Sequence, residues 1–378
     1  MNKNQIKQNN KIDNGINNNE LIDRLINKRY KILEFINSGA FASVFKAIDL
    51  DASFLNKEDV FVAVKIMLKG KRKNTKEIND RLNYEVNTFA KLSFSKNVIN
   101  MKDVFEWDKY YVIVMELVEG IDLSKKFSVY NNILSTNEFI YYFEQIAKGL
   151  KEIHDSNIIH RDVKPANILI TKHQKAKISD FGISKIKSII NETNEDSFSP
   201  GTPRYTAPEQ FINFESKKNI YSYESDIYSV GVMMYEFITG TTLFLNTNYG
   251  SSNVKEREKE NFKKHLVKEV LRPRYINPDI PQSIENIIMH CLAKEVKNRY
   301  KNFDELLNDL QKAKLELDVK KDFPEMNWEA DKISNMKLNY NIRYKNFIEE
   351  FPYRFTIPTL LIVFASLILF IVVIIFNQ

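Results

Sequence analysis

The sequence predicts an α+β fold in which a β-rich lobe precedes an α-rich lobe and one C-terminal transmembrane helix. Between residues 30 and 66, β-branched and aromatic residues broadly alternate with polar ones, as they do in half-buried strands. Beyond Gly120, apolar residues instead recur at intervals of three and four, the spacing of amphipathic helices. Residues 357–376 contain no charged side chain.

The first lobe is expected to be a small sheet with one helix. Strands are predicted over residues 31–36, 44–47, 61–66 and 110–115. The polar stretch 49–59 is predicted to be a loop, and residues 79–92 have the apolar spacing of a helix.

The second lobe is expected to be mainly helical. Its first helix carries apolar residues at helical spacing from Phe139 to Ile153, and Ser135 with Glu138 predicts a capping box at its start. Further helices are predicted over residues 227–238, 283–292 and 303–315.

The segments at the two ends of the chain differ from this body. Residues 1–20 hold eight asparagines and three isoleucines and lack the apolar run of a signal peptide, so residues 1–26 are expected to be a disordered tail. The folded body is expected over residues 27–315, with the first lobe ending near residue 118, and a polar linker over residues 316–355.

A transmembrane helix is predicted over residues 356–376. The 20 uncharged residues 357–376 span about 30 Å as a helix, which is the thickness of the hydrocarbon core. Their 16 Leu, Ile, Val and Phe side chains contribute roughly −5 to −10 kcal/mol to insertion. Five basic residues precede this run: Lys332, Lys337, Arg343, Lys345 and Arg354. By the positive-inside rule we expect a single-pass protein of the cell membrane, held in the lipid bilayer with its body in the cytoplasm.

Composition excludes several classes of function. The 378 residues suffice for two packed lobes and an accessory segment. The net charge of +6 is spread along the chain, which argues against nucleic acid as a partner. The single cysteine, Cys291, excludes an intramolecular disulfide and a zinc site built from cysteines, and it favours a reducing compartment.

Two acidic motifs stand in the second lobe at a defined spacing. Residues 160–167 read His-Arg-Asp-Val-Lys-Pro-Ala-Asn, and Asp180 begins an Asp-Phe-Gly triplet eighteen residues after Asp162. Upstream, residues 62–65 read Val-Ala-Val-Lys at the end of a predicted strand. Glycine is scarce, with ten in the chain, so each glycine is informative about the backbone.

With these motifs, the chain resembles a eukaryotic-like serine/threonine protein kinase from about Tyr30 to Leu315. Seven of the ten glycines fall where this family uses glycine, and Asn167 lies between Asp162 and Asp180 at the family's spacing. The resemblance implies a bilobal protein kinase fold that transfers the γ-phosphate of ATP to Ser/Thr hydroxyls of proteins. The finer likeness is to bacterial membrane-anchored serine/threonine kinases, here without PASTA repeats. A homodimer formed through the small lobe is an expectation of that family alone.

The resemblance assigns chemical roles to charged residues of the second lobe. Asp162 would be the catalytic base, and Lys164 would contact the γ-phosphate. Asn167 and Asp180 would bind Mg²⁺ or Mn²⁺. Phosphoryl transfer needs a carboxylate that accepts the proton of the attacking hydroxyl, and it needs oxygen ligands for a metal that neutralises phosphate charge.

The resemblance also implies a nucleotide site built mostly by the first lobe. Its residues are Asn37, Gly39, Val44, Ala63, Lys65, Glu85, Glu116, Val118 and Leu169. Lys65 would hold the α- and β-phosphates and pair with Glu85, for which Glu77 is the weaker alternative. In the family's phosphate loop G-x-G-x-x-G-x-V, this chain keeps the middle glycine and has Asn37 and Ala42 at the outer positions. Asn tolerates positive φ and Ala is small, so a similar hairpin is expected.

Residues between Gly182 and Pro208 resemble an activation segment. Its candidate phosphorylation sites are Thr193, Ser197 and Ser199, because a phosphate there would supply an anionic partner for Arg161. Thr202 fits the substrate platform of a serine/threonine kinase. Three further residues are implied to be structural: Glu209 and Arg299 as an ion pair, and Asp226 as the brace of the loop around Asp162.

Three functions stay open on the sequence alone. An active membrane-anchored kinase, activated by autophosphorylation, is favoured because every charged catalytic position is filled. A pseudokinase scaffold that binds partners through the kinase fold is the alternative, motivated by Asn37 and Ala42. A kinase for small molecules or lipids is the third, and the Ala207-Pro208-Glu209 platform argues against it.

Overall fold

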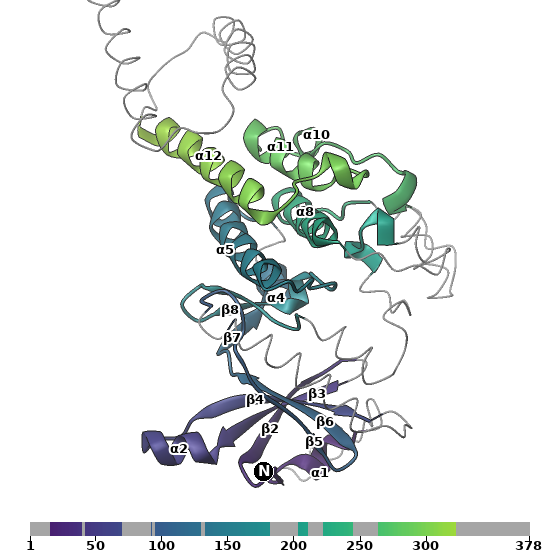
Figure 1. The fold of residues 1–378 in the computed structure, drawn as a ribbon. Helices are drawn as coiled ribbons and strands as arrows, with labels where there is room; N and C mark the ends of the chain where they lie inside the picture. Colours follow the sequence, from purple (N-terminus) through teal and green to yellow (C-terminus); the bar gives the residue numbers. More distant parts are fainter. Residues whose placement is uncertain are drawn as a thin grey trace, which may run out of the picture. The chain divides into compact units, whose positions relative to one another are not determined.

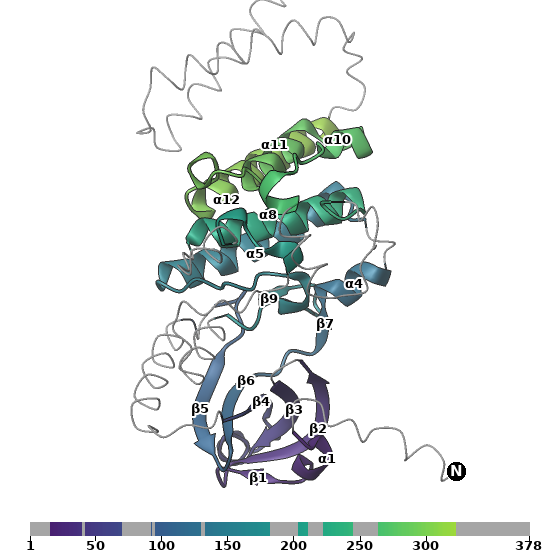
Figure 2. The ribbon, with the colours of Figure 1, turned by 90° about the vertical axis from the view of Figure 1, so that its right-hand side faces the viewer.

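The computed structural model describes residues 16–39, 42–69, 92, 95–129, 133–181, 203–210, 222–244 and 264–322. The chain divides into two compact units, residues 1–317 and 318–378. Nearly all described residues belong to the first unit, which contains a lobe of strands and a lobe of helices (Figures 1 and 2).

The small lobe is a six-stranded antiparallel sheet in the order β1-β2-β3-β4-β6-β5. The strands are β1 Leu25–Ile26, β2 Tyr30–Ser38, β3 Ala42–Asp49, β4 Phe61–Leu68, β5 Met101–Trp107 and β6 Tyr110–Glu116. The four strands predicted from the sequence are confirmed within β2, β3, β4 and β6. The sequence analysis missed β5, an edge strand in which Val104 is the one buried residue.

Apolar residues cover both faces of this sheet, which explains why β4 is apolar at every position except Lys65. On one face, Phe45 and Val64 belong to a core confined to the small lobe. On the other face, Ala63 and Met67 belong to the core that continues into the large lobe. Alternation along β4 places Lys65 on this second face, where the two lobes meet.

The large lobe packs helices against a three-stranded sheet. Its strands are β7 Gly120–Asp122, β8 Ile168–Thr171 and β9 Ala176–Ile178. Its helices are α4 Leu123–Val129, α5 Thr136–Asp155, α8 Tyr223–Thr239, α10 Pro273–Ile276, α11 Gln282–Cys291 and α12 Phe303–Asp322. The predicted helices of this lobe are confirmed, as is the capping box, in which Ser135 Oγ accepts from the Glu138 amide.

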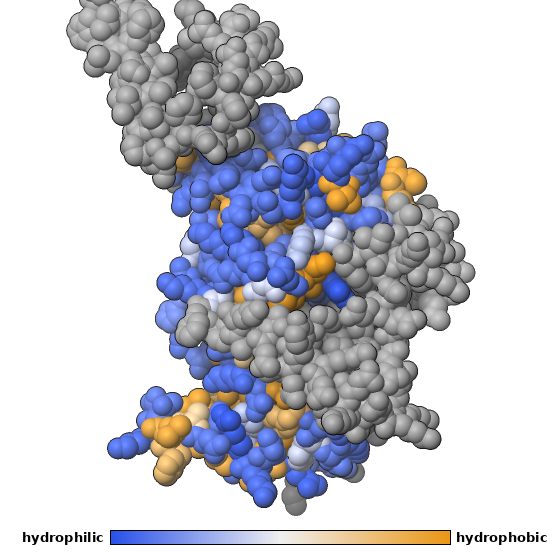
Figure 3. Space-filling model, viewed as in Figure 1, coloured by the Kyte–Doolittle hydropathy of each residue, from blue (hydrophilic) through white to orange (hydrophobic). Residues whose placement is uncertain are grey.

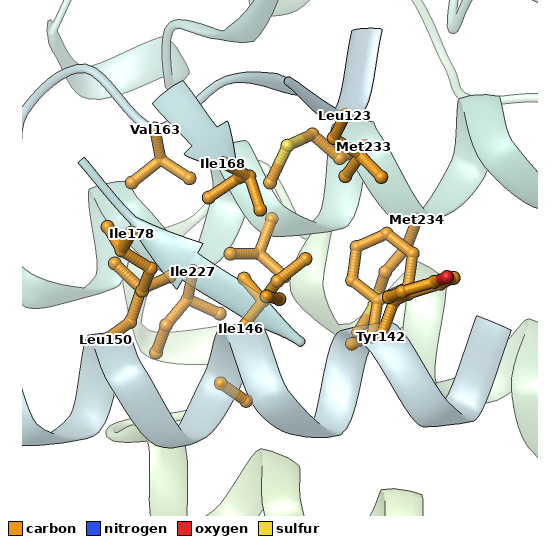
Figure 4. Close-up of a cluster of buried hydrophobic side chains, with 14 of the residues drawn as sticks. Leu123, Tyr142, Ile146, Leu150, Val163, Ile168, Ile178, Ile227, Met233 and Met234 are labelled. Atoms are coloured by element: carbon orange, nitrogen blue, oxygen red, sulfur yellow. The ribbon is translucent and has the colours of Figure 1, made fainter. Parts of the chain in front are cut away.

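One hydrophobic cluster joins α5, α8 and the small sheet of the large lobe (Figure 4). Ile146 and Leu150 of α5 meet Ile178 of β9 and Ile227 of α8 in this cluster. α8 is buried from Ser225 to Thr239 and also packs on α11. At that contact, a Cβ on Gly231 would lie 2.5 Å from Cys291 Cβ, so the close approach of the two helices requires glycine.

The prediction that residues 1–26 are a disordered tail is wrong for residues 16–26. This segment forms α1 Asn18–Leu21 and β1, and β1 pairs with β2. Ile16, Leu21 and Ile26 are buried in the core of the small lobe. Three apolar residues at intervals of five fit neither a strand nor a helix period, which is why the sequence pattern did not reveal them.

The prediction of a loop over residues 49–59 is also wrong in part, because helix α2 spans Leu50–Asn56. Asp49 caps its N-terminus by accepting from the Ala52 amide, and Arg29 holds the same carboxylate at 2.7 and 2.8 Å. No residue of α2 is buried, so this helix is not held by burial of an apolar face. An orange patch lies over α2 at the lower left of Figure 3. Phe54 of α2 is 85% exposed.

The C-terminal boundaries of the prediction are tested in part. α12 continues to Asp322, seven residues beyond the predicted end of the body at residue 315. The predicted membrane segment 356–376 lies outside the described residues. Among the described residues, no helix is both long and apolar enough to span a bilayer.

The burial of residues 16–26 can be tested with two neighbouring residues of β1. Ile26 is fully buried, whereas Leu25 is 48% exposed. We expect Ile26→Ala to lower the free energy of unfolding by about 2–4 kcal/mol, because it leaves a cavity in the core. Leu25→Ala, the matched control, should change it by less than about 0.5 kcal/mol. Denaturant titration of both variants measures the difference, and equal midpoints would contradict the packing of this segment.

Candidate active site

The loop over residues 160–167 is anchored by one buried carboxylate, that of Asp226 on α8. Asp226 Oδ2 accepts from the His160 amide at 2.8 Å, and Oδ1 accepts from the Arg161 amide at 3.0 Å. His154 Nε2, from the last turn of α5, lies 2.8 Å from Oδ2. These contacts hold Arg161 at φ +68°, a backbone conformation that non-glycine residues rarely adopt.

The environment of Asp226 keeps it ionised. Burial alone would raise the pKa of this carboxyl, but the hydrogen bond from His154 and the His160 amide outweigh burial, and the net pKa is lowered. The anchor is therefore a charged acceptor for two backbone amides.

Asp162, Lys164 and Asn167 meet at the exposed side of this loop. Lys164 Nζ lies 2.7 Å from Asp162 Oδ2. Asn167 Nδ2 donates to the Asp162 carbonyl at 2.7 Å and to Oδ2 at 3.1 Å. The structure thus brings together three residues that the sequence analysis selected, with the Asp162 carboxylate partly exposed and its rotamer held by Asn167.

A second set of hydrogen bonds joins this loop to the segment that ends at Asp180. The Ser179 amide and Oγ both donate to the Asn167 carbonyl, at 2.8 and 3.0 Å. His160 Nε2 lies 2.9 Å from the Ser179 carbonyl. The two motifs, whose residues Asp162 and Asp180 are eighteen positions apart in the sequence, are therefore joined by one set of hydrogen bonds.

Lys65 connects the small lobe to this cluster. Its Nζ lies 2.8 Å from Asp180 Oδ1, and Lys65 is 8% exposed. Asp180 has φ +61°, a second strained position beside the same cluster. The implied partner of Lys65, Glu85, lies outside the described residues, so the described partner is Asp180.

The oxygen atoms of this cluster fit a magnesium ion bound together with phosphates. Asn167 and Asp180 supply an amide and a carboxylate, and Mg²⁺ typically takes one or two such protein ligands, with phosphate and water oxygens completing its shell. In the described part of the chain, no three His, Cys, Asp or Glu side chains gather as a metal site, so a metal cage made by protein alone is not present there.

The apolar residues of the implied nucleotide site belong to one cluster. Val44 and Lys65 are cross-strand partners in β3 and β4, so their side chains share a face of the sheet. Ala63 shares this face, two residues before Lys65 on β4. Val44, Val118 and Leu169 are half-buried and pack against the core that joins both lobes.

The phosphate-loop segment forms a hairpin despite its two missing glycines. Asn37 pairs with Val44 across β2 and β3, and the Gly39 amide donates to the Ala42 carbonyl at 2.9 Å. Asn37 Oδ1 accepts from the Ser38 amide. The hairpin expected from the sequence is therefore present up to residues 40 and 41, which lie outside the described part.

The ion pair between Glu209 and Arg299 is also present. Two guanidinium nitrogens of Arg299 lie 2.8 and 2.7 Å from the two carboxylate oxygens of Glu209. The Arg299 side chain is fully buried and also donates to the carbonyls of Ala293, Glu224 and Lys294. A bidentate pair with these additional acceptors satisfies the buried charge.

Several predicted site residues lie outside the described part of the chain. They are Glu85, Thr193, Ser197, Ser199 and Thr202. Conversely, sequence reasoning missed His154 and Ser179, which hold Asp226 and the Asn167 carbonyl. His154 follows Ile153, the last buried residue of α5, so it stands at the edge of the apolar face of this helix. That position was the one sign in the sequence that His154 could face the core.

Comparison with known proteins agrees with this geometry. Residues 30–310 match the model of the protein kinase domain family. The chain is 36% identical over 301 residues to a probable serine/threonine-protein kinase of Clostridium perfringens, covering 79% of this chain and 40% of that protein. It is 33% identical over 293 residues to serine/threonine-protein kinase PrkC of Bacillus subtilis, covering 78% and 42%. The chain thus spans about two fifths of the length of these curated relatives.

The fold is shared with a solved structure as well. The kinase domain of PknI from Mycobacterium tuberculosis superposes with a TM-score of 0.54 at 17% identity, covering 77% of this chain and 97% of that domain. A likeness at this identity concerns the fold. Together with the family match over residues 30–310, it leads to one conclusion: the chain belongs to the protein kinase family.

Proposed function

We propose that this protein is a serine/threonine protein kinase that transfers the γ-phosphate of ATP to hydroxyls of protein substrates. The observation that carries the proposal is the cluster in which Asp162, Lys164 and Asn167 meet within hydrogen-bonding distance, beside the Lys65–Asp180 pair. The relatives from Clostridium perfringens and Bacillus subtilis, both named as serine/threonine-protein kinases, support the same function.

Each residue of the cluster has a defined task in this reaction. Asp162 would orient the substrate hydroxyl and accept its proton, since its carboxylate is partly exposed and held by Asn167. Lys164 would place its ammonium on the γ-phosphate, where it offsets negative charge as the bond to the leaving group breaks. Lys65 would hold the α- and β-phosphates.

Asn167 and Asp180 would hold Mg²⁺ or Mn²⁺. When bound, the ion neutralises phosphate charge. In the absence of nucleotide, the charges of Lys65 and Asp180 neutralise each other. Once ATP and its metal bind, Lys65 would contact the phosphates and Asp180 would contact the metal. The pair thereby keeps both charged groups satisfied in the resting protein.

Two substitutions test the transfer reaction. Asp162→Asn removes the proton acceptor and Asp180→Ala removes a metal ligand. We expect each to lower the rate of phosphate transfer from Mg-ATP to a generic protein acceptor by at least about 100-fold. Asp155→Asn, at an exposed aspartate at the end of α5, is the matched control.

The outcome separates this proposal from the pseudokinase alternative, which the outer positions of the phosphate loop, Asn37 and Ala42, motivate. Binding of nucleotide by the unmodified protein without any transfer would favour the pseudokinase. Equal transfer by all variants would show that the activity comes from elsewhere.

We further propose that phosphorylation in the activation segment switches the enzyme on. A phosphate at Thr193, Ser197 or Ser199 would give Arg161, the residue that precedes Asp162, an additional anionic partner. Incubation with Mg-ATP should add phosphate to one of these hydroxyls, as read by mass spectrometry, and the corresponding alanine variant should show reduced transfer. Phosphate found only elsewhere in the chain would contradict this switch.

Membrane anchoring through residues 356–376 is proposed on the sequence pattern alone. We expect the full chain to sediment with membranes after a carbonate wash, because about −5 to −10 kcal/mol of side-chain transfer free energy favours insertion. A chain ending before Ile357 should stay in the supernatant. Recovery of the full chain in the supernatant would contradict the anchor.

A further inference from the structure

An ion pair to which the reaction above gives no role links the two lobes at Glu116, one of the residues of the implied nucleotide site. Lys177 Nζ lies 2.8 Å from both carboxylate oxygens of Glu116. Glu116 ends β6 of the small lobe, whereas Lys177 is the middle residue of β9 in the large lobe. The lysine side chain is 16% exposed and the glutamate side chain 32%.

The position of Lys177 places this pair next to the proposed adenine site. Lys177 is the cross-strand partner of Leu169, so the two side chains lie on the same face of the small sheet in the large lobe. Lys177 also precedes Asp180 by three residues, and Glu116 precedes Val118 by two. The pair therefore connects residues 116–118, the segment that would bind adenine, with strand β9, which leads to the proposed metal ligand Asp180.

The carboxylate of Glu116 is further held by the segment before β5. The Asn100 amide donates to Glu116 Oε2 at 3.3 Å, and the Glu116 amide donates to the Asn100 carbonyl at 2.8 Å. The same segment is fastened to β9, since the Ile99 amide donates to the Ile178 carbonyl at 2.9 Å and the Ile178 amide donates to the Asn97 carbonyl at 2.8 Å. Glu116 and Lys177 thus close a ring of contacts that includes both lobes.

A nearby ion pair offers a contrast. Lys172 lies 2.9 Å from Glu119, but its side chain is 65% exposed and that of Glu119 is 70% exposed. Exposed pairs of this kind contribute little because water screens them. The Lys177–Glu116 pair is less exposed, so its attraction is screened less.

We infer that the Lys177–Glu116 pair is a positioning strut that sets the distance between the adenine-binding segment and Asp180, and thereby sets nucleotide affinity. The inference rests on the proposed function. A nucleotide seated against Leu169 would exclude water from the face that carries Lys177, which strengthens the pair, so binding and ion pairing are linked. Neither side chain touches the transferred phosphate in this scheme, so the pair acts on binding more than on the chemical step.

The test is a double-mutant cycle on the full-length chain in detergent, with Lys177→Met, Glu116→Gln and the double variant. Calorimetry measures the dissociation constant of Mg-ADP, which requires no phosphate transfer. We expect each single change to weaken binding about three- to tenfold and the double change to be no worse than either, because the charges act as a pair. The KM for ATP should rise by a similar factor while kcat changes less than twofold.

Controls separate a strut from a general effect on folding. Lys172→Met and Glu119→Gln, at the exposed pair, should leave nucleotide affinity within about twofold of the unmodified protein. The exchanged pair, Lys177→Glu with Glu116→Lys, should recover part of the lost affinity, which a merely structural role would not predict. Thermal unfolding of each variant shows that the protein is folded.

The results distinguish failure of the strut from failure of the proposed function. If the unmodified protein binds Mg-ADP and the effects of Lys177→Met and Glu116→Gln add independently, or match those at Lys172 and Glu119, the strut is excluded. If the unmodified protein binds no nucleotide, the proposed function fails, and the strut with it.

Discussion

The buried carboxylate of Asp226 is the interaction on which the site depends. It accepts from two consecutive amides and is approached by His154, so it fixes the loop that carries Asp162 to helix α8, which is buried from Ser225 to Thr239. Because α8 is buried from Ser225 to Thr239, the loop over residues 160–167 is attached to a rigid part of the core. The strained backbone conformation of Arg161 is maintained because the hydrogen bonds that the His160 and Arg161 amides donate to Asp226 stabilise that conformation.

The small lobe positions a charged amine, that of Lys65, next to Asp180. A sheet covered on both faces gives β4 an apolar run in which one lysine is buried. Lys65 can stay there because Asp180 neutralises it across the lobes. The candidate site therefore lies where one hydrophobic core continues from the small lobe into the large lobe and a charge pair also links the two lobes.

The fold and most of the site could be predicted because their signals are local. Alternation revealed β2, β3, β4 and β6, and helical spacing with the Ser135 capping box revealed α5. What was missed depends on tertiary contacts. Helix α2 is held by Asp49 and Arg29 and not by an apolar face, and Ile16 and Ile26 become core residues only when the sheet is formed. The Lys65–Asp180 contact joins residues 115 positions apart, which no periodicity can indicate.

The close packing of α8 on α11 has a practical consequence. Cys291, the one cysteine of the chain, is fully buried against Gly231, and burial raises the pKa of its thiol far above the ordinary value. A thiol in that state reacts slowly with alkylating reagents. A cysteine introduced at an exposed position such as Phe54 would thus accept a fluorophore or spin label selectively, without first removing the native residue, so that movements of the small lobe could be followed spectroscopically.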